Sequence, residues 1–361
     1  MKKNLFLVLL PALIAAGCIG ESESRLWKTD VVAVVVNEGN AAAKDGSINF
    51  YYEAYDSLLM NPIKNDAIQA SIQSVAFTNG GALWFVCNNP DKIMVFDIET
   101  GNYSPTAIKD SLRNPRYLAI YSDSYSLSYN LFVTNKGAAA GDGSFPDSYV
   151  LVYDLVSNST FAPTKRLSCG ADAEGIVIVD GKIYVATGAG VKVFDVNNLA
   201  NTPTTLAYTS TWGAAKQFVL DSLNNLWVSY SGGKVQYINT QRVEAVSNKD
   251  IPLDALSGNI TLTRSGKHII SFVNEKDGAG ADSVTIYRTD VTSGTASPIF
   301  TGKYNVRGIN VNLFTGSIYV AAEQDGTSTL LLIKENGELL HRKATGIGTK
   351  QFRFFTMTYA L

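Results

Sequence analysis

The stretch LWFVCNNPDKIMVFDI, residues 83–98, contains the unit from which most of the chain is built. Residues 83–87 form an apolar run of strand length, and Asn88 and Asn89 then form a polar corner before a second run at residues 93–98. Short runs rich in β-branched and aromatic residues, separated by turn residues, indicate strands. The stretch therefore predicts two consecutive strands that are joined at a polar corner.

The same unit recurs along the chain. Further first strands occupy residues 31–36, 131–134, 183–187, 226–230, 269–273 and 318–322, and each is followed by a second strand. Most copies are also preceded by a shorter strand, as at residues 72–77. Seven copies share the residues that follow position 17, which gives each copy roughly 49 residues, the spacing of a four-stranded β-propeller blade.

The two ends of this array each contain an incomplete unit. The first copy has no short strand before it, and residues 352–359 form a strand that belongs to no copy. Pairing these two strands would close a ring and remove an exposed sheet edge. The sequence therefore predicts an all-β fold, a seven-bladed β-propeller closed by the C-terminal strand completing the first blade, in one domain over residues 28–361.

The N-terminal segment is predicted to lie outside this fold. Lys2 and Lys3 precede an apolar run at residues 5–16, so residues 1–17 have the pattern of a secretory signal peptide. Small residues and then Cys18 resemble the bacterial lipobox, in which the cysteine is lipidated, although Ala15 stands where leucine is usual. The alternative is ordinary cleavage with Cys18 as a bystander.

Residues 18–27 are expected to form a lipidated flexible tether, which would be the only attachment to the membrane. Residues 21–24, Glu-Ser-Glu-Ser, resemble the surface-export signal of Bacteroidota-type lipoproteins, and a simple polar tether is the alternative. We therefore expect the protein to be lipid-anchored at the outer membrane and to face the exterior.

Composition narrows the function further. With 30 Lys and Arg against 32 Asp and Glu, the net charge of −2 gives no electrostatic footprint for nucleic acid. Two histidines are too few for a multi-histidine metal site. Cys87 and Cys169 are expected to be buried thiols rather than a disulfide.

Several motifs resemble a known family. The corner Asn37-Glu38-Gly39-Asn40, residues 75–77 with 83–86, and residues 310–312 with 316–321 are similar to those of YncE-like seven-bladed propellers. The resemblance is to the surface lipoproteins of Bacteroidota that include cobalamin-binding propellers. It implies a non-catalytic protein that captures a nutrient, with cobalamin or another corrinoid as leading candidate, and passes it to an outer-membrane TonB-dependent transporter.

Ligand-binding residues are expected on the funnel face, where the inner strands begin. Amide groups suit corrin carboxamides, arginines suit a phosphate and an aromatic ring suits a ring face. At the starts of inner strands the candidates are Gln73, Arg116, Glu174, Trp212, Lys216 and Arg307, and at the corners they are Asn37, Asn88, Asn135, Tyr230 and Asn274. The alternative is that these residues satisfy turns and join neighbouring blades.

Two insertions, residues 137–147 and 276–282, are expected to project from the same face. Asp142 with Asp147, or Asp277 with Asp282, could hold calcium, and no other cofactor is expected. Two other functions stay open: a surface propeller that binds protein or glycan without a small-molecule ligand, and a calcium-dependent lactonase-like hydrolase. The second is disfavoured because the sequence contains no nucleophile elbow and no zinc motif.

Lipidation can be tested by metabolic labelling with a palmitate analogue. We expect the wild type to be tagged and the Cys18→Ala variant to lose the tag, because no other cysteine follows small residues at the end of the leader. A Cys87→Ala variant, the matched control, should keep the tag. Labelling that persists without Cys18 would contradict the lipoprotein prediction.

Overall fold

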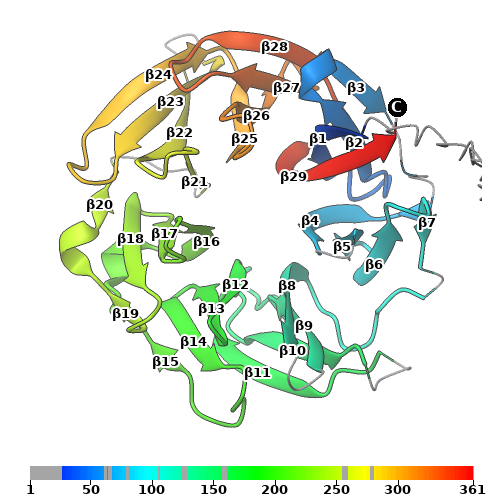
Figure 1. The fold of residues 1–361 in the computed structure, drawn as a ribbon. Coiled ribbons are helices and arrows are strands. Elements are labelled where there is room, and N and C mark those ends of the chain that lie inside the picture. The colour runs from blue at the N-terminus through cyan, green and yellow to red at the C-terminus, as the bar shows by residue number, and fades with distance from the viewer. Residues whose placement is uncertain are drawn as a thin grey trace, which may run out of the picture.

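The computed structural model describes residues 27–60, 63, 67–78, 81–104, 106–123, 128–156, 161–253, 259–276 and 280–360. The signal peptide, Cys18 and Asp277 lie outside these residues. In the described residues the strands form seven antiparallel sheets around a central axis, so the predicted seven-bladed propeller is confirmed (Figure 1). The described helices are single 3-10 turns, and none has the length or apolar character to cross a membrane.

Each blade runs from an inner strand at the central channel to an outer strand at the rim of the ring. Blade 1 contains, in that order, β29 (Thr349–Ala360), β1 (Trp27–Asn37), β2 (Ser47–Tyr52) and β3 (Ser57–Met60). Blade 2 contains β4 (Ser71–Phe77), β5 (Ala82–Asn88), β6 (Lys92–Asp97) and β7 (Asn102–Tyr103). Blade 3 contains β8 (Pro115–Asp123), β9 (Ser128–Asn135), β10 (Ser148–Asp154) and β11 (Lys165–Gly170). Blade 4 contains β12 (Ile176–Val179), β13 (Lys182–Thr187), β14 (Gly190–Asp195) and β15 (Thr204–Thr205).

The remaining blades follow the same order. Blade 5 contains β16 (Ala215–Leu220), β17 (Leu226–Tyr230), β18 (Lys234–Asn239) and β19 (Glu244–Ala245), and β20 (Ile251–Pro252) also pairs with β18. Blade 6 contains β21 (Thr261–Leu262), β22 (His268–Lys276), β23 (Asp282–Asp290) and β24 (Ala296–Gly302). Blade 7 contains β25 (Asn305–Val311), β26 (Ile318–Gln324), β27 (Thr327–Ile333) and β28 (Leu339–Ala344).

The two ends of the chain meet in blade 1. β29, red in Figure 1, pairs antiparallel with β1 from Asn37↔Thr349 to Trp27↔Ala360. The predicted pairing of residues 352–359 with the first strand is therefore confirmed, and β29 is the inner strand of a blade whose other strands come from the N-terminus. The ring has no open edge where the array begins and ends.

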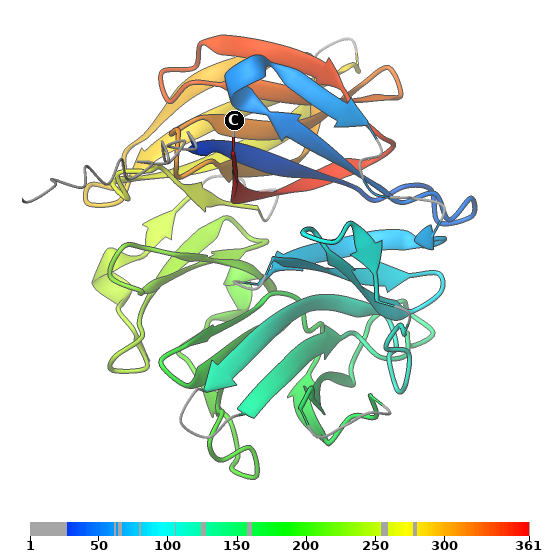
Figure 2. The same cartoon turned by 45° about the vertical axis from the view of Figure 1, so that its right-hand side comes forward.

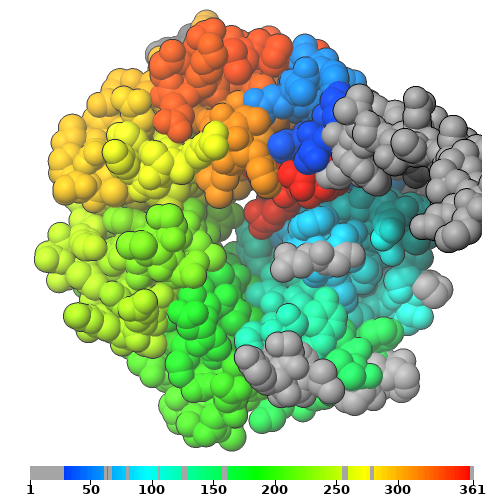
Figure 3. All heavy atoms as spheres, viewed as in Figure 1, coloured from blue at the N-terminus to red at the C-terminus, as the bar shows by residue number. Residues whose placement is uncertain are grey.

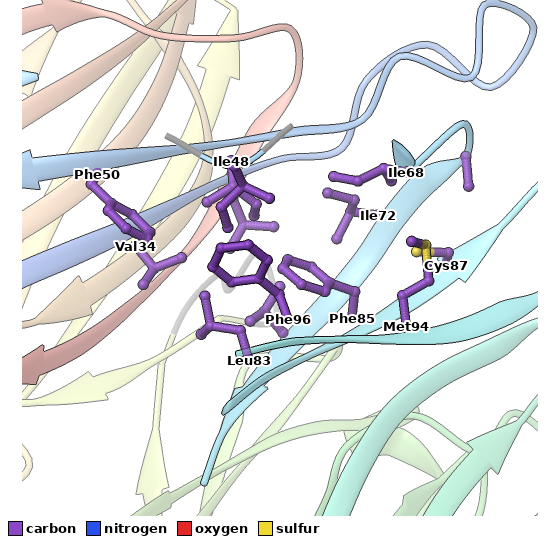
Figure 4. Packing of buried hydrophobic residues seen from close by; sticks show 14 of the residues in the cluster. Val34, Ile48, Phe50, Ile68, Ile72, Leu83, Phe85, Cys87, Met94 and Phe96 are labelled. Carbon is purple, nitrogen blue, oxygen red and sulfur yellow. The ribbon is translucent and has the colours of Figure 1, made fainter. Parts of the chain in front are cut away.

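The hydrophobic core lies between the blades. In the described residues the buried apolar side chains form seven clusters, one for each pair of neighbouring blades. Figure 4 shows the cluster between blades 1 and 2, where Val34 and Phe50 lie near Leu83 and Phe85. Because successive side chains point to opposite faces of a strand and most blades are covered on both faces, the strands read as nearly continuous apolar runs.

The two described cysteines lie in this core. Cys87 and Cys169 are free and buried, which confirms the prediction of two buried thiols. Burial raises the pKa of each thiol to about 12. The core position therefore keeps both thiols protonated at neutral pH.

Polar contacts reinforce the interface between the last blade and the first. The Glu53 carboxylate, in blade 1, accepts hydrogen bonds from the Tyr319 hydroxyl at 2.9 Å and from Thr315 Oγ1 at 2.9 Å. Asn312 Nδ2 donates to it at 3.1 Å, and Ser317 Oγ also donates. One carboxylate thus joins four side chains of blade 7 to blade 1.

Figure 2 shows the sheets fanned around the central channel, and the inner strands all run along this channel in the same direction. Their first residues gather at one end of the central channel, the funnel face, and their last residues at the other end, the far face. Asn135, which ends β9, pairs with Pro115, which begins β8, so the insertion at residues 137–147 leaves from the funnel face as expected. In blade 6, β22 runs antiparallel to the inner strand β21 and ends at Lys276, so Lys276 also lies at the funnel face.

Closure of the ring can be tested at Phe352. Its side chain is fully buried and packs against Tyr319 of blade 7 with ring centroids 5.5 Å apart. We expect Phe352→Ala to lower the free energy of unfolding by about 3–5 kcal/mol in urea titrations, because it leaves a cavity at the closing interface. Thr356→Ala, at an exposed position of the same strand, is the control. Equal losses in the two variants would contradict this role for β29.

Candidate functional site

A polar cavity of about 270 Å³ lies at the funnel end of the central channel. We call it the funnel pocket. Figure 3 shows an opening at the centre of the ring, beside the red atoms of the C-terminal strand. Each of the seven blades contributes at least one lining residue, which lies at or just before the start of its inner strand. The lining residues are Gln73, Arg116, Tyr117, Glu174, Lys216, Gln217, Asn259, Arg307, Lys350 and Gln351.

The structure brings five of the predicted site residues together in this pocket, namely Gln73, Arg116, Glu174, Lys216 and Arg307. Arg116 Nε donates to Glu174 Oε2 at 2.9 Å, and Arg116 Nη1 donates to Gln73 Oε1 at 2.5 Å. These bonds join blades 2, 3 and 4 across the funnel face. Their role in binding a ligand stays a prediction.

The network continues through Glu38, which the sequence placed at the first corner. Gln73 Nε2 donates to Glu38 Oε1 at 2.9 Å, and Arg307 Nη2 lies 2.7 Å from Glu38 Oε2. Burial raises the pKa of Glu38, but Lys350 and Arg307 outweigh it and hold that pKa below its usual value. Glu38 therefore stays ionised and fixes the two cations around it.

Glu174 is held in the same way on the other side of the pocket. Its carboxylate lies 2.8 Å from Lys136 Nζ as well as against Arg116. Burial raises its pKa, but Arg116 and Lys136 outweigh burial and keep the pKa low. Glu174 is thus an ionised carboxylate between two cations.

Positive charge exceeds negative charge at the funnel pocket. Its described lining includes four cationic side chains, those of Arg116, Lys216, Arg307 and Lys350. Two carboxylates offset part of this charge, because Glu174 pairs with Arg116 and Glu38 pairs with both Arg307 and Lys350. Within the described part of the chain, Lys216 forms no ion pair. A cavity with such an excess of cations in partly buried positions attracts anions.

Lys350 is the most perturbed of these cations. Its pKa falls to about 8 because burial and the positive charges of Arg116 and Arg307 outweigh the attraction of Glu38. Lys350 Nζ lies 3.0 Å from Glu38 Oε1. The pocket therefore contains an amine that can change its charge in a mildly alkaline range.

The four corner asparagines do not line the pocket, although they lie at the funnel face. The side chain of Asn37 donates to Asn49 Oδ1 at 2.7 Å and accepts from Thr349 Oγ1 at 2.6 Å. Asn135 Oδ1 accepts from the backbone N–H of Arg113 at 3.0 Å, and Asn274 bonds both backbone polar groups of Val306. With Asn88 in its favourable amide orientation, its nitrogen faces backbone carbonyl oxygens. These contacts match the alternative that the corner amides satisfy turns, and their predicted contact with a ligand stays a prediction.

Trp212 and Tyr230 also lie outside the pocket lining. Their rings pack edge to face with centroids 5.4 Å apart in the cluster between blades 4 and 5. The Tyr230 hydroxyl is buried and donates to Gln236 Oε1 at 2.8 Å. Both rings therefore take part in packing between blades 4 and 5, and their predicted contact with a ligand stays a prediction.

The sequence reasoning missed a polar constriction that forms the floor of the pocket. Gln217 Nε2 donates to the Tyr117 hydroxyl at 3.1 Å, and Asn259 Nδ2 donates to Gln217 Oε1 at 2.6 Å. Gln351 completes this layer and accepts from the backbone N–H of Val75 at 3.0 Å. Polar side chains within otherwise apolar inner strands were the available signal. We call these four residues the polar constriction.

The structure contains no evident metal centre in the part of the chain that it describes. No group of three or more His, Cys, Asp or Glu side chains there could hold an ion. Asp142 is exposed and accepts hydrogen bonds from the backbone and side chain of Ser144 at 2.9 and 2.7 Å. Calcium binding by the insertions stays a prediction.

The structural role of the corner amides can be tested at Asn37. We expect Asn37→Ala to lower the free energy of unfolding by about 1–3 kcal/mol, since it leaves buried polar partners unpaired. Arg307→Gln, at the rim of the pocket, should cost less than about 1 kcal/mol because its ion pair is partly solvated. Urea titrations would measure both, and a larger loss for Arg307→Gln would contradict this assignment.

Comparison with known proteins supports the fold. No family model matches the chain, and no curated protein matches its sequence. Among solved structures, the chain is similar to a candidate 6-phosphogluconolactonase from Bacteroides fragilis, with a TM-score of 0.64, 13% identity and coverage of 90% of this chain and 98% of that chain.

Two further similar structures lead to the same conclusion. The periplasmic gluconolactonase of Pseudomonas aeruginosa matches with a TM-score of 0.59 and 12% identity, over 91% of this chain and 99% of that chain. Apo AztD from Citrobacter koseri matches with a TM-score of 0.55 and 10% identity, over 91% of this chain and 98% of that chain. Likeness at these identities establishes the propeller fold and leaves the YncE-like lipoprotein family as a resemblance.

Proposed function

We propose that the protein captures a small anionic nutrient in the funnel pocket without converting it and passes it to an outer-membrane TonB-dependent transporter. The observation that carries the proposal is the excess of positive charge at the pocket, where four lining cations are offset by only the two carboxylates of Glu174 and Glu38 among the described residues. The lipid anchor at Cys18 would hold the propeller at the membrane surface. This location is supported by the pattern of the N-terminal sequence.

The size and chemistry of the pocket favour a sugar acid or a phosphorylated sugar. Arginine binds carboxylate or phosphate oxygens in a bidentate manner, and amide side chains both donate to and accept from hydroxyl groups. A volume of about 270 Å³ suits a ligand of this size. A corrinoid is much larger, so only its phosphate could enter between Arg116 and Arg307 while the ring lay outside.

Calorimetry with purified protein tests this proposal. The probes are 6-phosphogluconate, gluconate and cyanocobalamin, and we expect a phosphorylated or carboxylated probe to bind. Arg307→Gln should weaken that binding by about tenfold or more, because it removes a charged hydrogen-bond donor. Arg242→Gln is the matched control, since Arg242 is 75% exposed on blade 5 and lies outside the pocket lining. Absence of binding by all three probes would overturn the proposal.

The charge state of Lys350 adds a pH dependence. Below its pKa of about 8 the amine is positive and attracts an anion, and above that pH the attraction is lost. We expect the affinity for 6-phosphogluconate to fall as the pH rises from 7 to 9.5. Lys350→Met should bind more weakly at pH 7 and show a smaller change with pH. An unchanged pH profile in that variant would contradict this role.

A lactone hydrolase is the second candidate, because Lys350 could act as a general base while Arg116 or Arg307 stabilises an oxyanion. The similar structures from Bacteroides fragilis and Pseudomonas aeruginosa carry lactonase names. Acid release from glucono-δ-lactone above the spontaneous rate, lost in Lys350→Met and kept in Arg242→Gln, would favour hydrolysis over capture. Unaltered spontaneous hydrolysis would favour capture.

A further inference from the structure

A second and larger cavity lies on the other side of the polar constriction. It has a volume of about 510 Å³ and is lined mainly by the inner strands of blades 1 and 4 to 7. It shares only the four residues of the polar constriction with the funnel pocket, and these are Tyr117, Gln217, Asn259 and Gln351. Most of its other lining residues follow, along the inner strands and the turns after them, those that line the funnel pocket, so it lies toward the far face. We call it the far chamber.

The walls of the far chamber are largely apolar. Val177, Val219, Leu262 and Phe354 line it, together with residues from the turns at the far face. Its volume lies within the range of small-molecule sites, which combine apolar walls with a few polar groups. The chamber therefore suits an apolar group that is accompanied by a polar one.

Three large apolar side chains at the far face line the same chamber. Leu220, Leu313 and Phe314 remain 41%, 58% and 50% exposed, respectively. Single exposed apolar residues are common at protein surfaces, but these three gather from blades 5 and 7 at one cavity. They would lose their contact with water if an apolar ligand occupied the chamber.

Among the described residues that line the far chamber, Arg353 is the only charged one. Its Nε donates to the backbone carbonyl of Val75 at 2.9 Å, and this bond holds the Arg353 side chain against β4, the inner strand of blade 2. Within the described residues, Arg353 forms no ion pair and its two terminal nitrogens have no hydrogen-bond partner. A guanidinium group stays charged in proteins, so it presents unused donors in a partly enclosed position.

We propose that the far chamber binds an amphipathic carboxylate, with the carboxylate on the terminal nitrogens of Arg353 and the apolar body against Leu313 and Phe314. Arginine and a carboxylate match in charge and in planar, bidentate geometry. The apolar lining supplies burial for a chain or a ring. Aliphatic and aromatic acids share this chemistry, and binding measurements with one acid of each kind distinguish them.

This site does not depend on the function proposed for the funnel pocket. The far chamber has a different cation, a different lining and access from the opposite face. Saturating 6-phosphogluconate should therefore leave binding at the far chamber unchanged. Failure of one proposal can thus be distinguished from failure of the other.

The experiment is calorimetry of the full chain with decanoate, 2-naphthoate and decanol. We expect decanoate or 2-naphthoate to bind, and decanol to bind at least about tenfold more weakly than decanoate if the aliphatic acid is preferred. Preference for decanoate would identify an aliphatic ligand, and preference for 2-naphthoate an aromatic one. Absence of binding by both acids would overturn the proposal. If decanoate is the preferred acid, a decanol affinity equal to that of decanoate would also overturn it.

Two variants locate the binding. Arg353→Gln should weaken binding of the preferred acid by about tenfold or more, whereas Arg307→Gln in the funnel pocket should leave it unchanged. Leu313→Asp is the second variant, which changes a half-exposed residue and should weaken binding by charge repulsion even if Arg353→Gln fails to fold. Leu223→Asp, at a 73% exposed position of the same face outside the chamber lining, is its control. Wild-type affinity in Leu313→Asp would overturn the proposal.

Discussion

The pairing of β29 with β1 is the constraint on which the rest of this structure depends. It closes the ring, and it also brings a strand from the C-terminus to the channel between blades 7 and 2. That one strand supplies Lys350 to the funnel pocket, Gln351 to the polar constriction and Arg353 to the far chamber. The same strand therefore closes the ring and completes both cavities. A chain without β29 would lose Lys350 and Arg353 as well as the inner strand of blade 1.

The inner strand of each blade has an unpaired backbone edge that faces the channel. Side chains of neighbouring blades form hydrogen bonds with some of these backbone groups. Asn259 Oδ1 accepts from the backbone N–H of Ile309 at 3.0 Å, and Asn310 Oδ1 accepts from the backbone N–H of Phe352 at 3.2 Å. Neighbouring inner strands also pack closely, since a Cβ on Gly308 would lie 1.9 Å from the carbonyl oxygen of Lys350. The four residues of the polar constriction form a polar layer in the channel, and both cavities are lined by this layer.

The sequence was sufficient for the blades and their closure, because strand periodicity and turn residues are local signals and the unpaired strand at each end had one simple partner. It also indicated Arg116, Glu174 and Arg307, because the start of an inner strand must face the channel mouth. It could not distinguish a corner asparagine that binds its own blade, such as Asn37, from one that faces a ligand, since both occupy the same turn position. Contacts between distant residues, such as Lys350 with Glu38, depend on blade geometry and leave no local pattern.

Native-state hydrogen exchange of the β29 amides tests the central claim most directly, because it reports whether the closing strand opens by itself. The account predicts that the hydrogen-bonded amides between Gln351 and Phe355 exchange with the free energy of global unfolding, as do those of β1 and β26. Exchange in β29 at a clearly lower free energy than in those two strands would contradict it, because the closing strand would then detach while the other blades stayed folded.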